Sequence, residues 1–397
     1  MKGVSLLKTY CKKAIPTDLQ TIERYAYEAM TGKLKRKDYS EFIAGYCNLS
    51  AKEIRKRARS AISWYPELEQ ALHWIALDMA ARIQARNLDL PPVRYSERHD
   101  GMCRKVRKIG LMSVMQQLME HVAVGCMEEL WQAKYEYHQY ASIRGKGQLK
   151  GARAIQKWTK AGKTKYFVKL DIRKCFQSVT RETAMRWLKR DIGKNRLLLW
   201  FVNELLKMHG DGLIIGSLLS QFLCNYFMSY AYRFVMGLHK ERRGKSIRLV
   251  NCALFYMDDI FLSGTDRRNL VMAVRRLIRF VLASFGLVIK ATWNVRRHDD
   301  VPIDMMGYVI KSTGRLKIRR RVFIRARRSF RKAWLGDRTC IVLYRVGAYY
   351  GYFKAARIHR LRPARRKDSA CIGIESTQRQ AGIIIGTAIR RELSCAA

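Results

Sequence analysis

Three aspartates lie where strand-like stretches of the sequence end. Asp258 and Asp259 separate two mostly apolar runs, 249–256 and 260–262, and this pattern predicts a hairpin with adjacent acids at its tight turn. Asp171 ends another strand-like run further upstream. Adjacent carboxylates raise each other's pKa, so a cation should lie against them. An isolated Asp-Asp pair is often only a surface turn, but three acids on neighbouring strands can hold two divalent metal ions.

The composition indicates a large, basic, globular protein. The 397 residues are enough for two or three domains, and 48% of them are hydrophobic. The formal net charge of +46, from 78 basic and 32 acidic residues, favours a polyanionic partner, although a structural RNA-binding protein would share it. The ten cysteines form no Cys-x-x-Cys pair, and no apolar run reaches the length of a membrane span. We therefore expect reduced thiols, no membrane partner and a cytoplasmic location.

Three motifs occur in the order of the palm motifs of reverse transcriptases. Residues 171–176, Asp-Ile-Arg-Lys-Cys-Phe, are similar to the first motif, residues 215–221 to the second, and Tyr-Met-Asp-Asp at 256–259 to the third. The resemblance covers residues 104–355. It implies an α+β right-hand polymerase fold with helical fingers, an antiparallel-sheet palm and a helical thumb.

The resemblance also implies roles for individual residues. The three aspartates and the backbone carbonyl of Ile172 would bind two Mg²⁺ ions, with Mn²⁺ as a possible replacement. Lys290 would be a general acid for the departing pyrophosphate, and Phe176 would lie beneath the sugar and select deoxynucleotides. The hairpin 305–318 resembles the one that grips the primer. The other residues expected at the nucleotide are Arg144 and Lys146 of a basic fingers loop, Ile215, Gly216, Gln221 and Tyr256.

The second palm motif departs from the common pattern. Most reverse transcriptases have Gln-Gly-x-x-x-Ser-Pro, whereas this chain has Ile215-Gly216-x-x-x-Ser220-Gln221. That variant resembles the reverse transcriptases of diversity-generating retroelements, which copy a template-repeat RNA with frequent errors at adenines and use the cDNA to rewrite a variable gene. Ile215 replaces an amide, and our hypothesis is that losing this polar contact loosens discrimination between base pairs.

Partners follow from the same resemblance. They would be a structured template RNA, the RNA/cDNA duplex, dNTPs and a small basic accessory variability protein, in a bacterial or phage-encoded system. One alternative is a retron- or phage-defence-type reverse transcriptase that copies its own non-coding RNA. Another, from a different class, is a catalytically idle RNA-binding scaffold.

We divide the chain into four parts. Residues 1–103 should be a helical N-terminal extension of the fingers, 104–165 the fingers, 166–315 the palm and 316–397 a basic helical thumb. Within them we expect helices that start near 17–20, 50–53 and 66, a helix over 109–130, and a charged loop at 239–248. The residues expected to bind the nucleic-acid duplex are Arg319, Arg320, Arg321, Arg325, Arg328, Arg331, Arg357 and Arg362.

Overall fold

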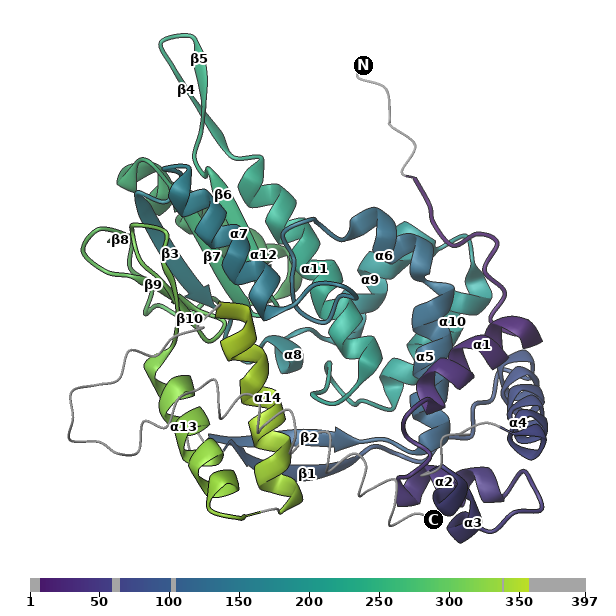
Figure 1. Cartoon of the computed structure of the whole chain (residues 1–397). Coiled ribbons are helices and arrows are strands. Elements are labelled where there is room, and N and C mark those ends of the chain that lie inside the picture. Colours follow the sequence, from purple (N-terminus) through teal and green to yellow (C-terminus); the bar gives the residue numbers. More distant parts are fainter. Residues whose placement is uncertain (1–7, 59–64, 101–104, 338, 357–397) are drawn as a thin grey trace, which may run out of the picture.

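The fold is a right hand built around a central antiparallel sheet (Figure 1). A computed structural model describes residues 8–58, 65–100, 105–337 and 339–356. Within these ranges no helix has the length and apolar character needed to cross a membrane. The cysteines whose state is described are free thiols, as the sequence predicts.

The N-terminal part forms a helical unit that packs on the fingers. Asp18 caps the first helix, within the predicted start at 17–20, and Ser50 forms a capping box with Glu53 at the third. Pro66 is the first residue of the fourth helix, as predicted, and the apolar face of this helix is buried. The helices are α1 (Leu19–Met30), α2 (Lys37–Ala44), α3 (Ala51–Arg57) and α4 (Pro66–Gln84).

The fingers differ from the prediction in two elements. A two-stranded antiparallel ribbon lies where helix was expected. Residues 94–100 form its first strand, and residues 109–111 are the last three of its second strand. The helix predicted over 109–130 therefore begins only at Val114, where the Ser113 side chain accepts a hydrogen bond from the Gln116 backbone N–H, and it is divided after Cys126. The elements are β1 (Arg94–Asp100), β2 (Lys105–Leu111), α5 (Val114–Cys126), α6 (Glu128–Lys134) and α7 (Gln148–Lys160).

The palm is a four-stranded sheet in the order β6-β7-β3-β8 with helices on both faces. Its strands are β3 (Tyr166–Asp171), β6 (Cys252–Tyr256), β7 (Asp259–Gly264) and β8 (Arg296–Arg297). Side chains alternate along β3: Val168 and Leu170 join the core formed with the large palm helices, whereas Phe167 packs with Trp158 of α7 on the other face. The palm helices are α8 (Cys175–Ser178), α9 (Arg181–Ile192), α10 (Arg196–Lys207), α11 (Leu218–Met236) and α12 (Arg267–Phe285).

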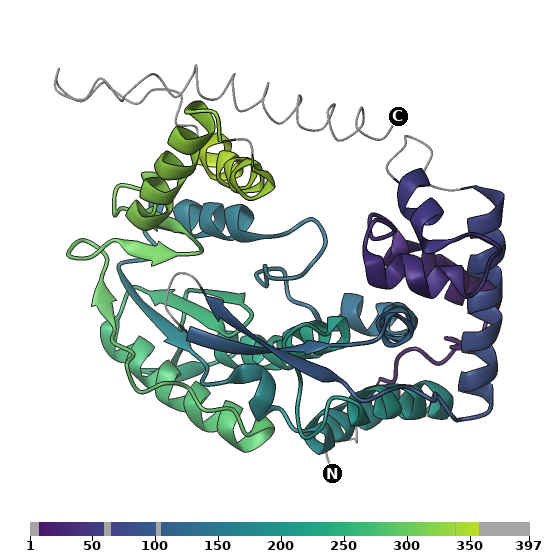
Figure 2. The same cartoon turned by 90° about the horizontal axis from the view of Figure 1, so that it is seen from below.

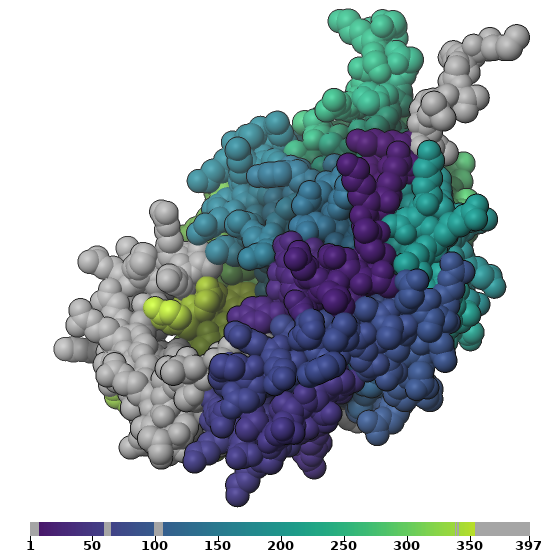
Figure 3. All heavy atoms as spheres, turned by 90° about the vertical axis from the view of Figure 1, so that its right-hand side faces the viewer, coloured from purple at the N-terminus to yellow at the C-terminus, as the bar shows by residue number. Residues whose placement is uncertain are grey.

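The charged loop predicted at 239–248 is instead a β-hairpin, β4 (His239–Arg242) and β5 (Lys245–Arg248). Arg243 and Gly244 form its two-residue turn, and both have positive φ, as in the type I′ turns common in hairpins of this length. The hairpin projects from the body of the molecule (Figures 1 and 3).

A small sheet connects the palm to the thumb. Strands β9 (Ile303–Met305), β10 (Tyr308–Ile310) and β11 (Leu316–Ile318) form it in sequence order, so our boundary at 315/316 divides this sheet. The thumb follows as α13 (Arg320–Trp334) and α14 (Cys340–Ala356). Arg357 and Arg362 lie outside the described residues. Figure 2 shows the thumb and α12 on opposite sides of the palm.

Candidate active site

The three aspartates of the first and third motifs lie together at one end of the palm sheet. Asp171, the last residue of β3, is the cross-strand partner of Asp259, the first residue of β7. Asp258 lies in the two-residue turn before β7, and its carbonyl accepts a 3.2 Å hydrogen bond from the Ile172 N–H. Met257 holds this turn with a φ of 54°, which is unfavourable for a side chain with a Cβ. The turn therefore keeps a strained residue beside the acids.

The electrostatics of the acids show that negative charge is crowded here. Loss of surrounding water, and then the charges of Asp258 and Asp171, raise the pKa of Asp259 to about 6. Loss of water also raises the pKa of Asp258, with Asp171 acting in the same direction. Lys290 partly offsets this charge, because its Nζ lies 2.7 Å from Asp171 Oδ2 and its backbone N–H donates to the Asp171 carbonyl over 2.9 Å.

The donor chemistry of this site suits divalent cations. Within the described ranges, no group of three or more His, Cys, Asp or Glu side chains is arranged as a metal site, and the Asp171 carboxylate is engaged by Lys290 instead. The charge of Asp171 nevertheless raises the pKa of Asp258 and of Asp259, and every atom that these carboxylates could offer to a metal ion is an oxygen. Mutually repelling carboxylates with hard oxygen donors fit Mg²⁺ or Mn²⁺.

The second motif begins with a close backbone approach between the palm and the fingers. The Ile215 carbonyl accepts a 2.8 Å hydrogen bond from the Gly110 N–H of β2. Gly216 has a φ of 111°, and a Cβ there would lie 2.8 Å from the Gly110 carbonyl oxygen, so only glycine fits. Ser217 then caps α11 and places Gln221 in its first turns.

A buried glutamate that the sequence reasoning missed anchors this motif. Glu120 of α5 is fully buried, and its carboxylate accepts hydrogen bonds of 2.9 Å from Ser217 Oγ and from the Leu218 N–H. The Leu219 N–H donates over 3.3 Å, and His209 Nε2 lies at 2.8 Å. A negative charge at the start of a helix is favourable, so Glu120 fixes where α11 begins. The one feature of the sequence that could have indicated Glu120 is that it is an acid within the mostly apolar sequence of α5.

The fingers loop meets the second motif through a side-chain contact. Ser142 Oγ donates to Gln221 Oε1 over 3.0 Å, so these distant segments adjoin. Arg144, two residues further on, is exposed. Lys146 is half-buried, and its Nζ donates to the carbonyls of Glu136 and Tyr137 over 2.9 and 2.8 Å. Of the two cations expected at the triphosphate, Arg144 is thus the accessible one, whereas Lys146 supports the loop.

Phe176 and Tyr256 both leave part of their rings accessible at the site. Phe176 is the second residue of α8, which begins directly after Lys174, a residue with positive φ that ends the turn from β3. Tyr256, beside the acidic turn, is half-buried near the side chain of Tyr352 from the thumb. Tyr352 also donates from its hydroxyl to Gln148 Oε1 of α7 over 2.6 Å.

The thumb arginines line the exposed side of α13. This helix buries Val322, Ala326, Ser329 and Ala333, which leaves the opposite side to its basic residues. Arg325 is half-buried, and Arg319 forms a 2.6 Å ion pair with Asp304 of β9. The fully exposed members of the predicted set are Arg320, Arg321, Arg328 and Arg331.

A palm sheet that carries these acids, with helical fingers and a basic helical thumb, defines the class of template-directed polymerases. The family model described as "Reverse transcriptase (RNA-dependent DNA polymerase)" matches residues 96–310, and the chain belongs to this family. The family and the fold predicted from the motifs are therefore confirmed. No curated protein sequence matches the chain.

Solved structures of two telomerases have a distant similarity to the chain. The telomerase of Candida albicans, in complex with a fragment of telomeric RNA, is 10% identical with a TM-score of 0.39. The match covers 78% of this chain and 62% of that one, so the chain spans less than two thirds of this relative. The apo telomerase of Candida tropicalis is 11% identical, with a TM-score of 0.39 and coverage of 57% and 54% of the two chains.

Proposed function

We propose that this chain copies RNA into DNA by extending a primer 3′-hydroxyl with dNTPs. The observation that carries the proposal is the cross-strand pairing of Asp171 with Asp259, with Asp258 in the adjoining turn. These residues and the Ile172 carbonyl would hold two Mg²⁺ ions, which would activate the hydroxyl and neutralise charge on the triphosphate. The same oxygens accept Mn²⁺.

The remaining residues of the site would position the reactants. The Phe176 ring would lie beneath the sugar, where it would clash with a ribose 2′-hydroxyl and so select deoxynucleotides. Gln221, next to the fingers loop, would contact the nascent base pair, and Arg144 would bind the triphosphate. Lys290, which is paired with Asp171, would give a proton to the departing pyrophosphate. Charge neutralisation and alignment would supply most of the rate enhancement, as in phosphoryl transfer generally.

Within this class we assign the chain to the diversity-generating type. The support is the second motif, in which an isoleucine stands in place of the usual glutamine at position 215. Its partners would be a structured template RNA, the RNA/cDNA duplex and a small basic accessory protein. An elevated error rate at template adenines would distinguish this type from a retron- or phage-defence-type enzyme that copies its own non-coding RNA.

Primer extension by the purified chain tests the proposal. The assay contains Mg²⁺, dNTPs and a primed RNA template, with copurifying RNA retained and the cDNA sequenced. We expect cDNA from the wild type and none from Asp258→Ala. The matched control is Asp300→Ala, which removes an exposed aspartate outside the site and should leave synthesis unchanged. A wild type that binds RNA but makes no more cDNA than Asp258→Ala would support the idle scaffold instead.

A further inference from the structure

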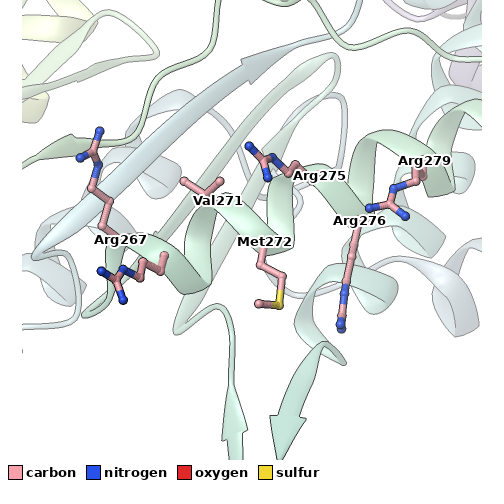
Figure 4. Close-up of a pocket in the computed structure, with 7 residues that line it drawn as sticks. Arg267, Val271, Met272, Arg275, Arg276 and Arg279 are labelled. Atoms are coloured by element: carbon pink, nitrogen blue, oxygen red, sulfur yellow. The ribbon is translucent and has the colours of Figure 1, made fainter.

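Helix α12 carries an arginine surface on the outside of the palm. Its inner side buries Leu270, Val274 and Leu277 in the main core, next to the sheet and α11. Its outer side lines a pocket of ≈ 620 Å³, where Val271 and Met272 lie among arginines (Figure 4). We define the outer arginine surface as Arg267, Arg268, Arg275, Arg276 and Arg279, all of which are exposed.

The spacing places three of these arginines in one row. Arg268, Arg275 and Arg279 are separated by seven and four residues, so they lie on the same side of a helix with 3.6 residues per turn. From Arg267 to Arg279 the helix rises by about 18 Å. Duplex nucleic acid carries on the order of one charge per 1.7 Å of its axis, so a duplex lying along α12 would offer enough phosphates for every arginine.

Helix stability does not account for these charges. Arg267 and Arg268 occupy the first turn of α12, where the helix dipole disfavours cations. Arg275 and Arg279 are four residues apart, a spacing at which like charges repel. In the described part of the chain none of the five forms an ion pair with an acid; the nearby Asp266 instead caps the helix by accepting from the Asn269 N–H over 2.8 Å. A bound polyanion would offset these costs.

The β4–β5 hairpin extends the surface. Arg276 Nη1 contacts the His239 carbonyl at 3.5 Å, and Lys240 Nζ donates to Asn269 Oδ1 over 2.5 Å, so the base of the hairpin is attached to α12. The hairpin adds further exposed cations, namely Arg242, Arg243, Lys245 and Arg248.

This surface is separate from the active site. The β3–β7 ladder runs from Asp171 and Asp259 at one end to Tyr166 and Gly264 at the other, about 17 Å away at 3.4 Å per residue. Arg267 and Arg268, at the start of α12 just beyond Gly264, lie near that far end, and the helix as a whole lies on the opposite side of the palm from the thumb (Figure 2). A duplex held between the acids and the thumb therefore does not reach it.

We propose that the outer arginine surface and the β4–β5 hairpin bind a double-stranded arm of structured RNA outside the polymerase cleft. The inference rests on the proposed function, since the arm would belong to the RNA that carries the template. Guanidinium groups suit phosphate recognition because they donate two parallel hydrogen bonds. Binding is to the backbone and depends on shape, as is usual for double-stranded RNA.

The test uses the full chain, two RNA probes and a matched pair of variants. One probe is a short primer–template that only fills the cleft, and the other is the same primer–template joined to a second double-stranded arm. Arg268→Gln/Arg275→Gln/Arg279→Gln removes the row of arginines. Lys189→Gln/Lys194→Gln/Arg196→Gln removes three exposed charges from α9, α10 and their connection.

We expect the arm to strengthen binding to the wild type and to the control variant. The arginine variant should bind the armed RNA at least about tenfold more weakly. The slope of log K against log[salt] should also become less steep by about 2–3, since each lost phosphate contact removes about 0.7–0.9. It should bind and extend the short primer–template like the wild type. Equal affinity of wild type and arginine variant for the armed RNA would overturn the inference. Because binding is measured without dNTPs, failure of DNA synthesis would be seen separately.

Discussion

Among the individual residues of the site, Asp259 shows how strongly the surroundings control the acids. Its pKa rises from 3.8 to about 6, while Lys169 and Arg319 act in the opposite direction without cancelling the effect. Divalent cations bind the ionised carboxylate, so protons and the proposed metal ions would compete at this residue. The acidic turn is therefore a place where pH and metal concentration should act together.

This competition predicts a pH profile that depends on magnesium. The ionised form predominates above the pKa and is lost as the pH falls through it, so primer extension at low Mg²⁺ should fall about tenfold per unit below pH ~6. Raising Mg²⁺ favours the ionised form and should move the midpoint to lower pH. Extension rates at several pH values and two Mg²⁺ concentrations test this. If the midpoint of the pH profile were the same at both Mg²⁺ concentrations, no metal-binding carboxylate would titrate in this pH range.

At the level of helices and strands, the position of α11 depends on one side chain from another helix. Glu120 of α5 accepts from Ser217 Oγ and from two backbone N–H groups at the start of α11. Gln221 lies less than a turn beyond these contacts, so an error in this start displaces the residue next to the fingers loop. Contacts across the fingers–palm boundary thus set the geometry of the second motif.

Replacing Glu120 with glutamine should loosen this junction. The change is isosteric, but it removes the charge and sets amide hydrogens against N–H donors, which should lower the free energy of unfolding by about 1–3 kcal/mol. The dNTP KM should rise more than kcat falls, because Gln221 is misplaced while the acids are not. Thermal unfolding and single-nucleotide incorporation measure the two effects. Glu69→Gln, at an exposed position of α4, should change neither; identical kinetics for both variants would refute the positioning role.

The sequence predicted the elements whose patterns are local. The acidic hairpin, the β3 strand and the cap at Ser50 follow from apolar runs and capping residues. Strand β1, Arg-Tyr-Ser-Glu-Arg-His-Asp, was missed because it has no apolar face to give a period of two. The start of the helix predicted at 109 was wrong because Gly110 pairs with the distant Ile215. Glu120 could not be assigned because its partners are about 90–100 residues away in sequence.

Across the whole molecule, separate parts are held to the palm by specific contacts. The N-terminal segment is attached where the Tyr10 N–H donates to the Asp191 carbonyl and Asn195 donates to the Cys11 carbonyl, each over 2.8 Å. At the other end of the chain, Tyr352 of the thumb lies 5.3 Å from Tyr308, centroid to centroid, and bonds to Gln148. The thumb therefore meets the palm directly at the turn before β10.

Gly307 in that turn should affect processivity, the number of nucleotides added per binding event, through its contact with the thumb. Its φ is 83°, and a Cβ would lie 2.7 Å from Tyr352 Cε1. Gly307→Ala should thus cost about 1 kcal/mol for the backbone and also push Tyr352 away. Because the acids are untouched, we expect the first nucleotide to be added at the normal rate, with several-fold fewer nucleotides added per binding event.

A glycine in the same small sheet separates the two effects of this substitution. Gly314 has a similar φ of 77°, but the three atoms nearest to an added Cβ all belong to the flexible side chain of Lys160. Gly314→Ala should therefore carry the backbone cost without moving the thumb, and its product lengths should match those of the wild type. Single-turnover extension with a trap for released enzyme measures product length. If both alanine variants shorten the products equally, backbone strain alone explains the loss, and the contact between Tyr352 and the palm does not couple the thumb to synthesis.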